Sequence, residues 1–232
     1  MGTLVSYDLQ DGIAAITMDD GAVNVLSPAM QAELNGALDQ AAGDGATVVL
    51  TGRPNRFSAG FDLGVLTAGG TAAADMLRGG FELSERLLSN ATPVVIACNG
   101  HAIAMASFLL LSADARIGTA GPYKIVANEV AIGLTMPFTA IEICRQRLAT
   151  PYFHRAVINA EVFDPESAVE AGFLDRVVPA EDLSEAARST ASELAKLHPA
   201  AHAATKLRAR AQALTAIRAA IEIDDAAVRE FL

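Results

Sequence analysis

The sequence predicts an α/β fold, with a sheet-containing body over residues 1–135 and a helical region over residues 136–232. In the body, two short apolar runs typical of strands covered on both faces, Thr47 to Leu50 and Pro93 to Cys98, are separated by a helical pattern. A strand, a helix and a second strand in this order imply a right-handed crossover and a parallel sheet. After Phe138 strand signals nearly vanish. The chain of 232 residues is 52% hydrophobic, which is enough for one substantial core.

The N-terminal elements have clear boundary signals. Val5 to Gln10 alternates apolar and polar residues, an Asp-Gly turn follows, and Ile13 to Met18 is the expected returning strand. Ser27 as N-cap and Pro28 as first helical residue predict an amphipathic helix that ends at Gly43.

Helical patterns dominate the rest of the chain. The helix between the two apolar runs begins near Ala72, and the segment from Ala102 to Ala113 is apolar all round, which predicts a buried helix. The C-terminal region contains one expected short strand, Arg176 to Val178. Its expected helices are Ile141–Leu148, Thr150–Asn159, Pro165–Ala171, Glu181–Leu197 and His202–Phe231.

Charge and cysteine content restrict the function. A net charge of -10 repels nucleic-acid phosphates, so we expect no nucleic-acid partner. Cys98 and Cys144 lack CxxC spacing, and His198 and His202 lack further ligands, so we expect buried thiols and no metal site. The sequence has no apolar stretch of roughly 18 residues and no N-terminal leader pattern. It therefore predicts a cytoplasmic protein with no membrane partner.

Two segments of small residues follow predicted strands. Phe57 to Leu63 follows the first apolar run after a polar loop, and Asn99 to Ser107 follows the second. Backbone N–H groups at such turns, and at the start of the buried helix, point outward and carry partial positive charge. Two turns of one sheet would bring such donors to one oxygen atom.

These segments and three later ones resemble the crotonase, or enoyl-CoA hydratase/isomerase, superfamily. The resemblance extends over nearly the whole chain, and the order and spacing of the pieces match the family. The matching pieces are Arg56–Leu63, Pro93–Gly100, Ser112–Ile117, Asn128–Gly133 and Ala168–Pro179.

The resemblance implies a ClpP-like spiral of β-β-α turns and a helical C-terminal region that builds a homotrimer or a dimer of trimers. It also implies an acyl-CoA thioester as partner, with coenzyme A entering as part of the substrate and no separate cofactor. In this family the backbone N–H groups of Phe61 and Met105 would form an oxyanion hole, and the carbonyl of Ala59 would accept from the adenine amino group. Met105 stands where the family usually has glycine.

The family carries catalytic carboxylates at two positions, which correspond to Phe108 and Glu129 here, so one glutamate remains. Hydration of a double bond needs two proton-transferring groups, whereas a shift from 3-enoyl to 2-enoyl needs one base. The residues around Glu129, namely Asn128 before it and Met136-Pro137-Phe138 after it, also resemble mitochondrial-type enoyl-CoA isomerases. We therefore expect an isomerase, with Glu129 partly desolvated and its pKa raised toward neutrality.

Other functions stay open at this point. An enoyl-CoA hydratase or an acyl-CoA hydrolase would use Glu129 with water, and Glu82 or Glu85 is a candidate second acid, although both fit a solvated helix face. The Phe108 substitution is also compatible with an acyl-CoA-binding protein that has lost catalysis.

An acidic protein that binds coenzyme A needs a local basic patch. The candidates are Arg53 and Arg56 before the first turn, and Lys206, with Arg208 and Arg210, near the C-terminus. Asp62 also adjoins the CoA-binding turn, where it fits a helix cap better than a proton carrier.

Overall fold

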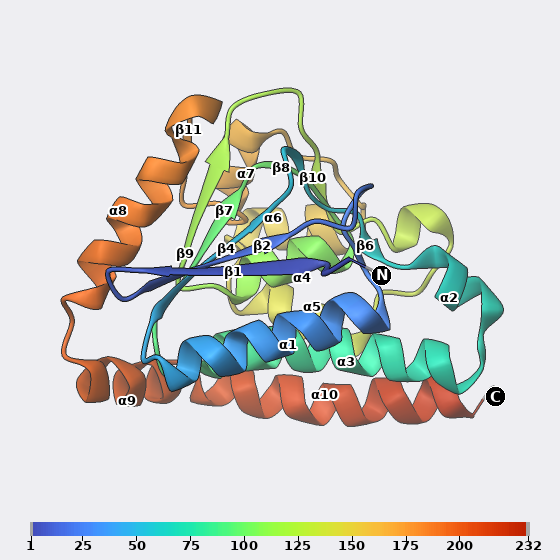
Figure 1. Ribbon diagram of the computed structural model, residues 1–232. Helices are drawn as coiled ribbons and strands as arrows, with labels where there is room; N and C mark the ends of the chain where they lie inside the picture. The colour runs from blue at the N-terminus through green and yellow to red at the C-terminus, as the bar shows by residue number, and fades with distance from the viewer. Residues whose placement is uncertain (1, 231–232) are drawn as a thin grey trace.

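The computed structural model describes residues 2–230, and its centre is a six-stranded sheet (Figure 1). The first two strands pair antiparallel and every later neighbour is parallel. In spatial order the strands are β1 (Val5–Gln10), β2 (Ile13–Met18), β4 (Thr47–Gly52), β7 (Val94–Cys98), β9 (Ala115–Thr119) and β11 (Arg176–Val178).

Shorter strands form a second layer. One small sheet has the order β10 (Ile125–Val126), β8 (Gly100–Ile103) and β5 (Asn55–Ser58), and another pairs β3 (Val25–Leu26) with β6 (Gly60–Phe61). A long strand, a short strand and a helix thus follow one another repeatedly, which confirms the predicted crotonase spiral.

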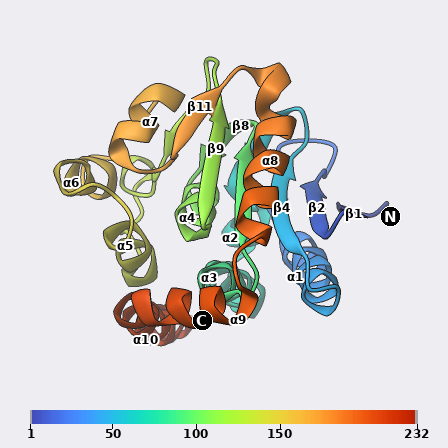
Figure 2. The same cartoon turned by 90° about the vertical axis from the view of Figure 1, so that its left-hand side faces the viewer.

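Helices surround these sheets. Helices α1, α3 and α10 run side by side below the large sheet (Figure 1), and α8 covers its outer face (Figure 2). The α-helices are α1 (Pro28–Gly43), α2 (Leu63–Ala68), α3 (Gly70–Ser89), α4 (Met105–Ser112), α5 (Phe138–Arg145), α6 (Thr150–Val157), α7 (Pro165–Ala171), α8 (Leu183–Ala195), α9 (Pro199–Ala209) and α10 (Ala211–Arg229), with 3-10 turns η1 (Val130–Ile132) and η2 (Ala180–Asp182).

The central strands are covered on both faces, as their continuous apolar runs predict. Val48 and Leu50 of β4 point into the main core, whereas Val49 points to the other face, where it packs in the cluster formed with Leu183 and Ala187 of α8. Because side chains alternate along a strand, both faces require apolar residues.

The predicted buried helix begins later than expected. All eight residues of α4 are buried, but Gly100–Ile103 forms strand β8. Ala104 then has the backbone angles φ 51° and ψ -123° before the helix begins. A four-residue strand is too short for its alternation to be distinguished from a helix of small apolar residues.

The last expected helix is also divided. Arg210, with φ -97° and ψ 4°, separates α9 from α10, and α9 begins at Pro199, before the expected start at His202. The expected end at Phe231 lies outside the described residues. Leu214, Ile217 and Ile221 of α10 belong to the main core, so the C-terminal region and the sheet body share one hydrophobic interior.

Candidate active site

A cavity of about 490 Å³ opens where the two turns of small residues meet the loop that contains Glu129. Its wall is largely apolar, which suits the acyl part of a thioester. The described residues that line it are Ala59, Phe61, Leu63, Leu66, Leu77, Phe81, Ile103, Ala104, Asn128, Glu129, Ile132, Leu134, Thr135, Pro137 and Val228.

The two turns contact each other directly at Gly60. This residue has φ +86°, and a Cβ there would lie 2.7 Å from the carbonyl oxygen of Ile103 and 3.3 Å from the backbone nitrogen of Met105. Glycine is therefore required both for its conformation and for the close approach of the two backbones. Phe61, the next residue, is thereby held beside the first turn of α4.

Met105 is the first residue of α4, where a backbone N–H has no acceptor within the helix. Its side chain is fully buried, so it packs into the core and does not line the cavity. The preceding residue, Ala104, has a backbone conformation that L-residues rarely adopt, and it is held by a 2.8 Å hydrogen bond from its N–H to the Val126 carbonyl. Strain of this kind is often retained at functional sites.

Asn24 holds the first turn in place, although no sequence motif singles it out. Its side-chain amide is completely buried and donates to the carbonyls of Met18, Arg56 and Phe57. Ser58 Oγ donates to the Asn24 carbonyl and accepts from the Gly60 N–H at 3.1 Å. In the sequence the residues around Asn24 resemble an ordinary polar loop, because most of its hydrogen-bond partners are distant along the chain.

Glu129 lies in the cavity wall at the start of η1, with 8% of its surface exposed. Its Oε2 atom is buried and has no hydrogen-bond partner among the described residues. Burial raises the pKa of Glu129 to about 7, and a hydrogen bond from its own backbone N–H lowers this pKa by a smaller amount. A carboxylate with this pKa exchanges protons readily near neutral pH.

The described part of the cavity wall has no second carboxylate beside Glu129. Among the described lining residues Glu129 is the one acid. Phe108 is buried, and its ring lies 6.4 Å from that of Phe81, which in turn lies 6.0 Å from the Phe61 ring. Aromatic packing therefore replaces an ionisable group at the Phe108 position.

The other candidate acids lie outside the cavity. Glu82 forms an ion pair with Arg78 at 2.7 Å, and Glu85 pairs with Arg218 at 2.5 Å. Both glutamates belong to a charged surface of α3, in agreement with the expectation that they lie on a solvated helix face.

Both cysteines are free and buried, as predicted. Burial raises the pKa of the Cys144 thiol, and the nearby Glu129 charge raises it further. Cys144 is therefore an uncharged core residue behind the carboxylate. No three His, Cys, Asp or Glu side chains within residues 2–230 are grouped as metal ligands.

Of the residues expected to contact coenzyme A, one lines the cavity and the others lie outside it. Ala59 lines the cavity. Arg53 pairs with Asp19 at 3.1 Å, and Arg56 is exposed on β5. Asp62 caps α2, accepting from the N–H groups of Gly64 and Val65 at 2.8 and 3.3 Å. The carboxylate of Asp62 is therefore engaged in helix capping.

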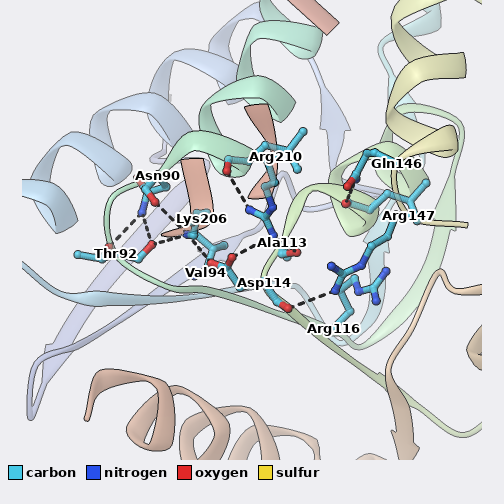
Figure 3. A network of polar contacts seen from close by, with 12 residues as sticks. Asn90, Thr92, Val94, Ala113, Asp114, Arg116, Gln146, Arg147, Lys206 and Arg210 are labelled. Carbon is cyan, nitrogen blue, oxygen red and sulfur yellow. Dashed lines mark hydrogen bonds and ion pairs between the residues drawn. The ribbon is translucent and has the colours of Figure 1, made fainter. Parts of the chain in front are cut away.

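Lys206 requires a correction, because the structure buries it instead of presenting it to a phosphate. Its ammonium group donates to Asp114 at 2.6 Å and to the carbonyls of Asn90 and Thr92 at 2.9 and 3.1 Å (Figure 3). All three N–H donors are thus used within the chain, and the side chain is 3% exposed. Lys206 holds α9 against the end of α4.

Comparison with known proteins gives consistent results for the whole chain. Residues 8–232 match the sequence model described as enoyl-CoA hydratase/isomerase. The chain is 32% identical over 213 residues to a probable enoyl-CoA hydratase of Rhodobacter capsulatus, an alignment covering 87% of this chain and 79% of that protein. It is 30% identical over 212 residues to human mitochondrial enoyl-CoA delta isomerase 1, covering 89% and 70%.

A solved Mycobacterium tuberculosis protein is more similar still. It is described as an enoyl-CoA isomerase in one structure, with a TM-score of 0.92, 52% identity and coverage of 96% of this chain and 97% of that one. In another structure it is described as a probable enoyl-CoA hydratase, with a TM-score of 0.92, 52% identity and coverage of 94% and 93%. The spiral, the two touching turns and these matches agree: the chain belongs to the enoyl-CoA hydratase/isomerase family, of the crotonase superfamily.

Proposed function

We propose that this protein is an enoyl-CoA isomerase that converts a 3-enoyl-CoA into a 2-enoyl-CoA, with Glu129 as the proton carrier. The observation that carries the proposal is the isolation of Glu129. It is the one acid among the described lining residues of the cavity, its Oε2 is unpartnered, and burial raises its pKa to about 7.

The reaction begins at the thioester. The C2 proton of a thioester is too weakly acidic for a carboxylate unless the developing enolate oxygen is stabilised. The N–H groups of Phe61 and Met105 are the proposed donors, and one such donor contributes roughly 2.7–4 kcal/mol to transition-state stabilisation. Their turns are held together by Gly60.

Glu129 then completes the shift. Its carboxylate takes the proton from C2, the C2–C3 double bond forms as the C3–C4 double bond is lost, and the same group returns the proton to C4. The carboxylate is regenerated and nothing is added or released. One acid is sufficient for this cycle, and its apolar surroundings at Phe61 and Phe81 favour return of the proton over its loss to water.

A second candidate is an enoyl-CoA hydratase, which the name of the Rhodobacter capsulatus relative favours. Glu129 would then have to serve both proton transfers with water as the nucleophile. The apolar Phe108 position argues against an efficient reaction of this type. A hydrolase, or an acyl-CoA-binding protein without catalysis, is the remaining alternative.

Substrate assays distinguish these activities. The purified protein is incubated separately with a 3-enoyl-CoA and with a trans-2-enoyl-CoA, and the products are separated chromatographically. We expect 2-enoyl product from the first substrate. Formation of a 3-hydroxyacyl product from the second substrate, without isomerisation of the first, would reject the isomerase. Release of free coenzyme A would indicate a hydrolase.

Variants test the role of Glu129 directly. Glu129→Gln should reduce turnover by roughly 10²-fold or more while thioester binding is retained. Glu142→Gln is a suitable control, because Glu142 is a surface carboxylate of α5 that pairs with Arg145 at 3.2 Å. Tight thioester binding by the unmodified protein with no turnover of any substrate would identify a passive binder.

The family resemblance also supports a homotrimer or a dimer of trimers, which light scattering after gel filtration would test. Within residues 2–230, no helix is long and apolar enough to cross a membrane. A cytoplasmic location stays a prediction.

A further inference from the structure

A second hollow of about 630 Å³ lies at the opposite end of α4 from the candidate active site. Helix α4 begins at Met105 beside the cavity and ends at Ser112, and Asp114 just beyond it lines the hollow. The wall also includes Arg147, Lys206 and Arg210, together with one side of α9. We call this region the α9 groove.

The ion pairs around the α9 groove contain more positive than negative charge. Lys206 and Arg210 share the Asp114 carboxylate at 2.6 and 3.0 Å. Arg116 and Arg147 share Asp175, with Arg147 at 3.7 Å. Four cations thus meet two carboxylates in these pairs. Figure 3 shows the four cations around Asp114.

The polar groups of α4 offset only part of this excess. The Leu111 carbonyl accepts from Gln146 at 2.8 Å, and the Ala113 carbonyl accepts from Arg210 at 3.4 Å. A helix C-terminus carries about half a negative charge. Burial lowers the pKa of Arg210, and the Asp114 carboxylate partly offsets this effect. The positive charge of Arg147 lowers the pKa of Arg210 further, because the two cations repel each other.

Two side chains that line the groove carry nitrogen atoms without a hydrogen-bond partner among the described residues. Arg147 is 25% exposed and contacts the Asp114 carbonyl at 3.2 Å and Asp175 through Nη2, and its Nε and Nη1 have no partner within the described chain. His202, which also lines the groove, has a buried Nδ1 without a partner among residues 2–230. A guanidinium edge and an imidazole on one hollow are suited to the oxygen atoms of a tetrahedral anion.

We propose that the α9 groove is a binding site for a phosphate group, either inorganic phosphate or a phosphate monoester, held by Arg147 and His202. A dianion would balance the two excess positive charges and occupy the unused donors. The site is separate from the acyl-CoA cavity, and its existence does not depend on the proposed isomerase activity.

Calorimetric titration tests the proposal on the complete protein. Inorganic phosphate and phenyl phosphate are titrated at constant ionic strength against a sodium chloride reference. At least one should bind, and Arg147→Gln and His202→Gln should each weaken binding about tenfold or more. Preference for phenyl phosphate would identify a monoester site, and preference for inorganic phosphate a site for the free ion.

Control variants separate specific binding from general charge effects. Arg145→Gln removes an exposed arginine of α5, and Arg208→Gln removes an exposed arginine of α9; both should bind phosphate as the unmodified protein does. Circular dichroism verifies that each variant is folded. If Arg147→Gln does not fold, His202→Gln alone provides the binding test. The proposal is overturned if neither anion binds. It is also overturned if Arg147→Gln and His202→Gln both bind phosphate as the unmodified protein does. A third contrary result is that Arg147→Gln changes only the oligomeric mass, because an acidic side chain of a second copy would then fill the groove.

Discussion

Gly60 packs against the backbone of Met105 so closely that a Cβ on Gly60 would lie 3.3 Å from the Met105 nitrogen. This contact joins the turn after β5 to the first turn of α4. It sets the relative position of the two donors that we propose for the oxyanion hole, the N–H groups of Phe61, which follows Gly60, and of Met105.

Gly60→Ala should therefore impair both stability and activity. The new methyl group would lie 2.7 Å from the Ile103 carbonyl oxygen in a residue with φ +86°, so the turns must separate. We expect a loss of about 2 kcal/mol in the free energy of unfolding and, because oxyanion donors depend on position, a roughly 10²-fold lower kcat. Urea denaturation and isomerase assays measure the two effects.

The control for Gly60→Ala is Gly36→Ala on the exposed side of α1, where a Cβ meets no atom within 4 Å. This substitution should stabilise the protein slightly. Equal effects of the two substitutions would contradict this account.

Ala104→Gly should stabilise the protein, although most substitutions to glycine do the opposite. Ala104 has φ 51° and ψ -123°, and relief of such strain contributes about 1–3 kcal/mol. The greater freedom of glycine in the unfolded chain removes about 0.4–1 kcal/mol of this gain. We expect a net increase of about 1 kcal/mol in the free energy of unfolding, read from the denaturation midpoint. Ala106→Gly within α4 should instead cost about 1 kcal/mol. A loss of stability in Ala104→Gly would show that the turn is not strained.

The activity should rise with pH through neutrality. Glu129 must be ionised to accept the C2 proton, and its pKa is raised to about 7 by burial. We expect kcat/KM to increase with pH up to about 7 and to level off above it. The Glu142→Gln variant should keep the same profile. A profile that is flat between pH 5 and 8 would exclude Glu129 as the base.

Glu129→Gln should be more stable than the unmodified protein at alkaline pH. Because the folded state raises the pKa of Glu129 from 4.5 to about 7, the protonated form favours folding. The resulting stability is complete below pH 4.5 and is lost as the pH rises through about 7. Glutamine stays neutral, so its advantage should grow from pH 5 to pH 8 and reach the order of 3 kcal/mol. Urea denaturation at both pH values measures it, and a constant difference between the two would contradict the raised pKa.

Lys206→Ala should reduce stability without weakening thioester binding. The substitution leaves the Asn90 carbonyl without the Lys206 donor and the Thr92 carbonyl with the Asn90 side-chain amide alone, and it removes one partner of Asp114. Because Arg210 still pairs with Asp114, the main cost is the unpaired buried Asn90 carbonyl, about 1–3 kcal/mol. Lys196→Ala provides the comparison, because Lys196 pairs with Glu193 on the surface and should cost less than about 1 kcal/mol. A folded Lys206→Ala protein with strongly raised KM would restore the original phosphate-contact hypothesis.

Local sequence patterns determined the elements with strong boundary signals. Ser27 caps α1 with its Oγ accepting from the Met30 N–H at 3.2 Å, and the helix extends from Pro28 to Gly43 as predicted. The strands Val5–Gln10, Ile13–Met18 and Arg176–Val178 also match the structure. These segments were predictable because alternation, capping and proline placement act over a few residues.

The candidate acid was also accessible from sequence, through its place in a family pattern and the apolar residue at Phe108. The structure confirms the expected desolvation of Glu129 and its raised pKa. By itself the chain could not show that Oε2 would lack a partner, since the elements around it are distant in sequence. Phe61, Ala104 and Val228, which line the same cavity, come from three separate parts of the chain.

Only the tertiary structure decided the roles of Asn24 and Lys206. Both are polar residues in segments that look solvated, and both are buried because backbone carbonyls from other elements require donors there. The sequence by itself determined the repeating strands and helices, the conformations available at its turns and the kinds of side chain at the site. Which distant segments supply each hydrogen-bond partner depends on packing, because burial makes an unpaired polar group costly and only the folded chain brings its partners within reach.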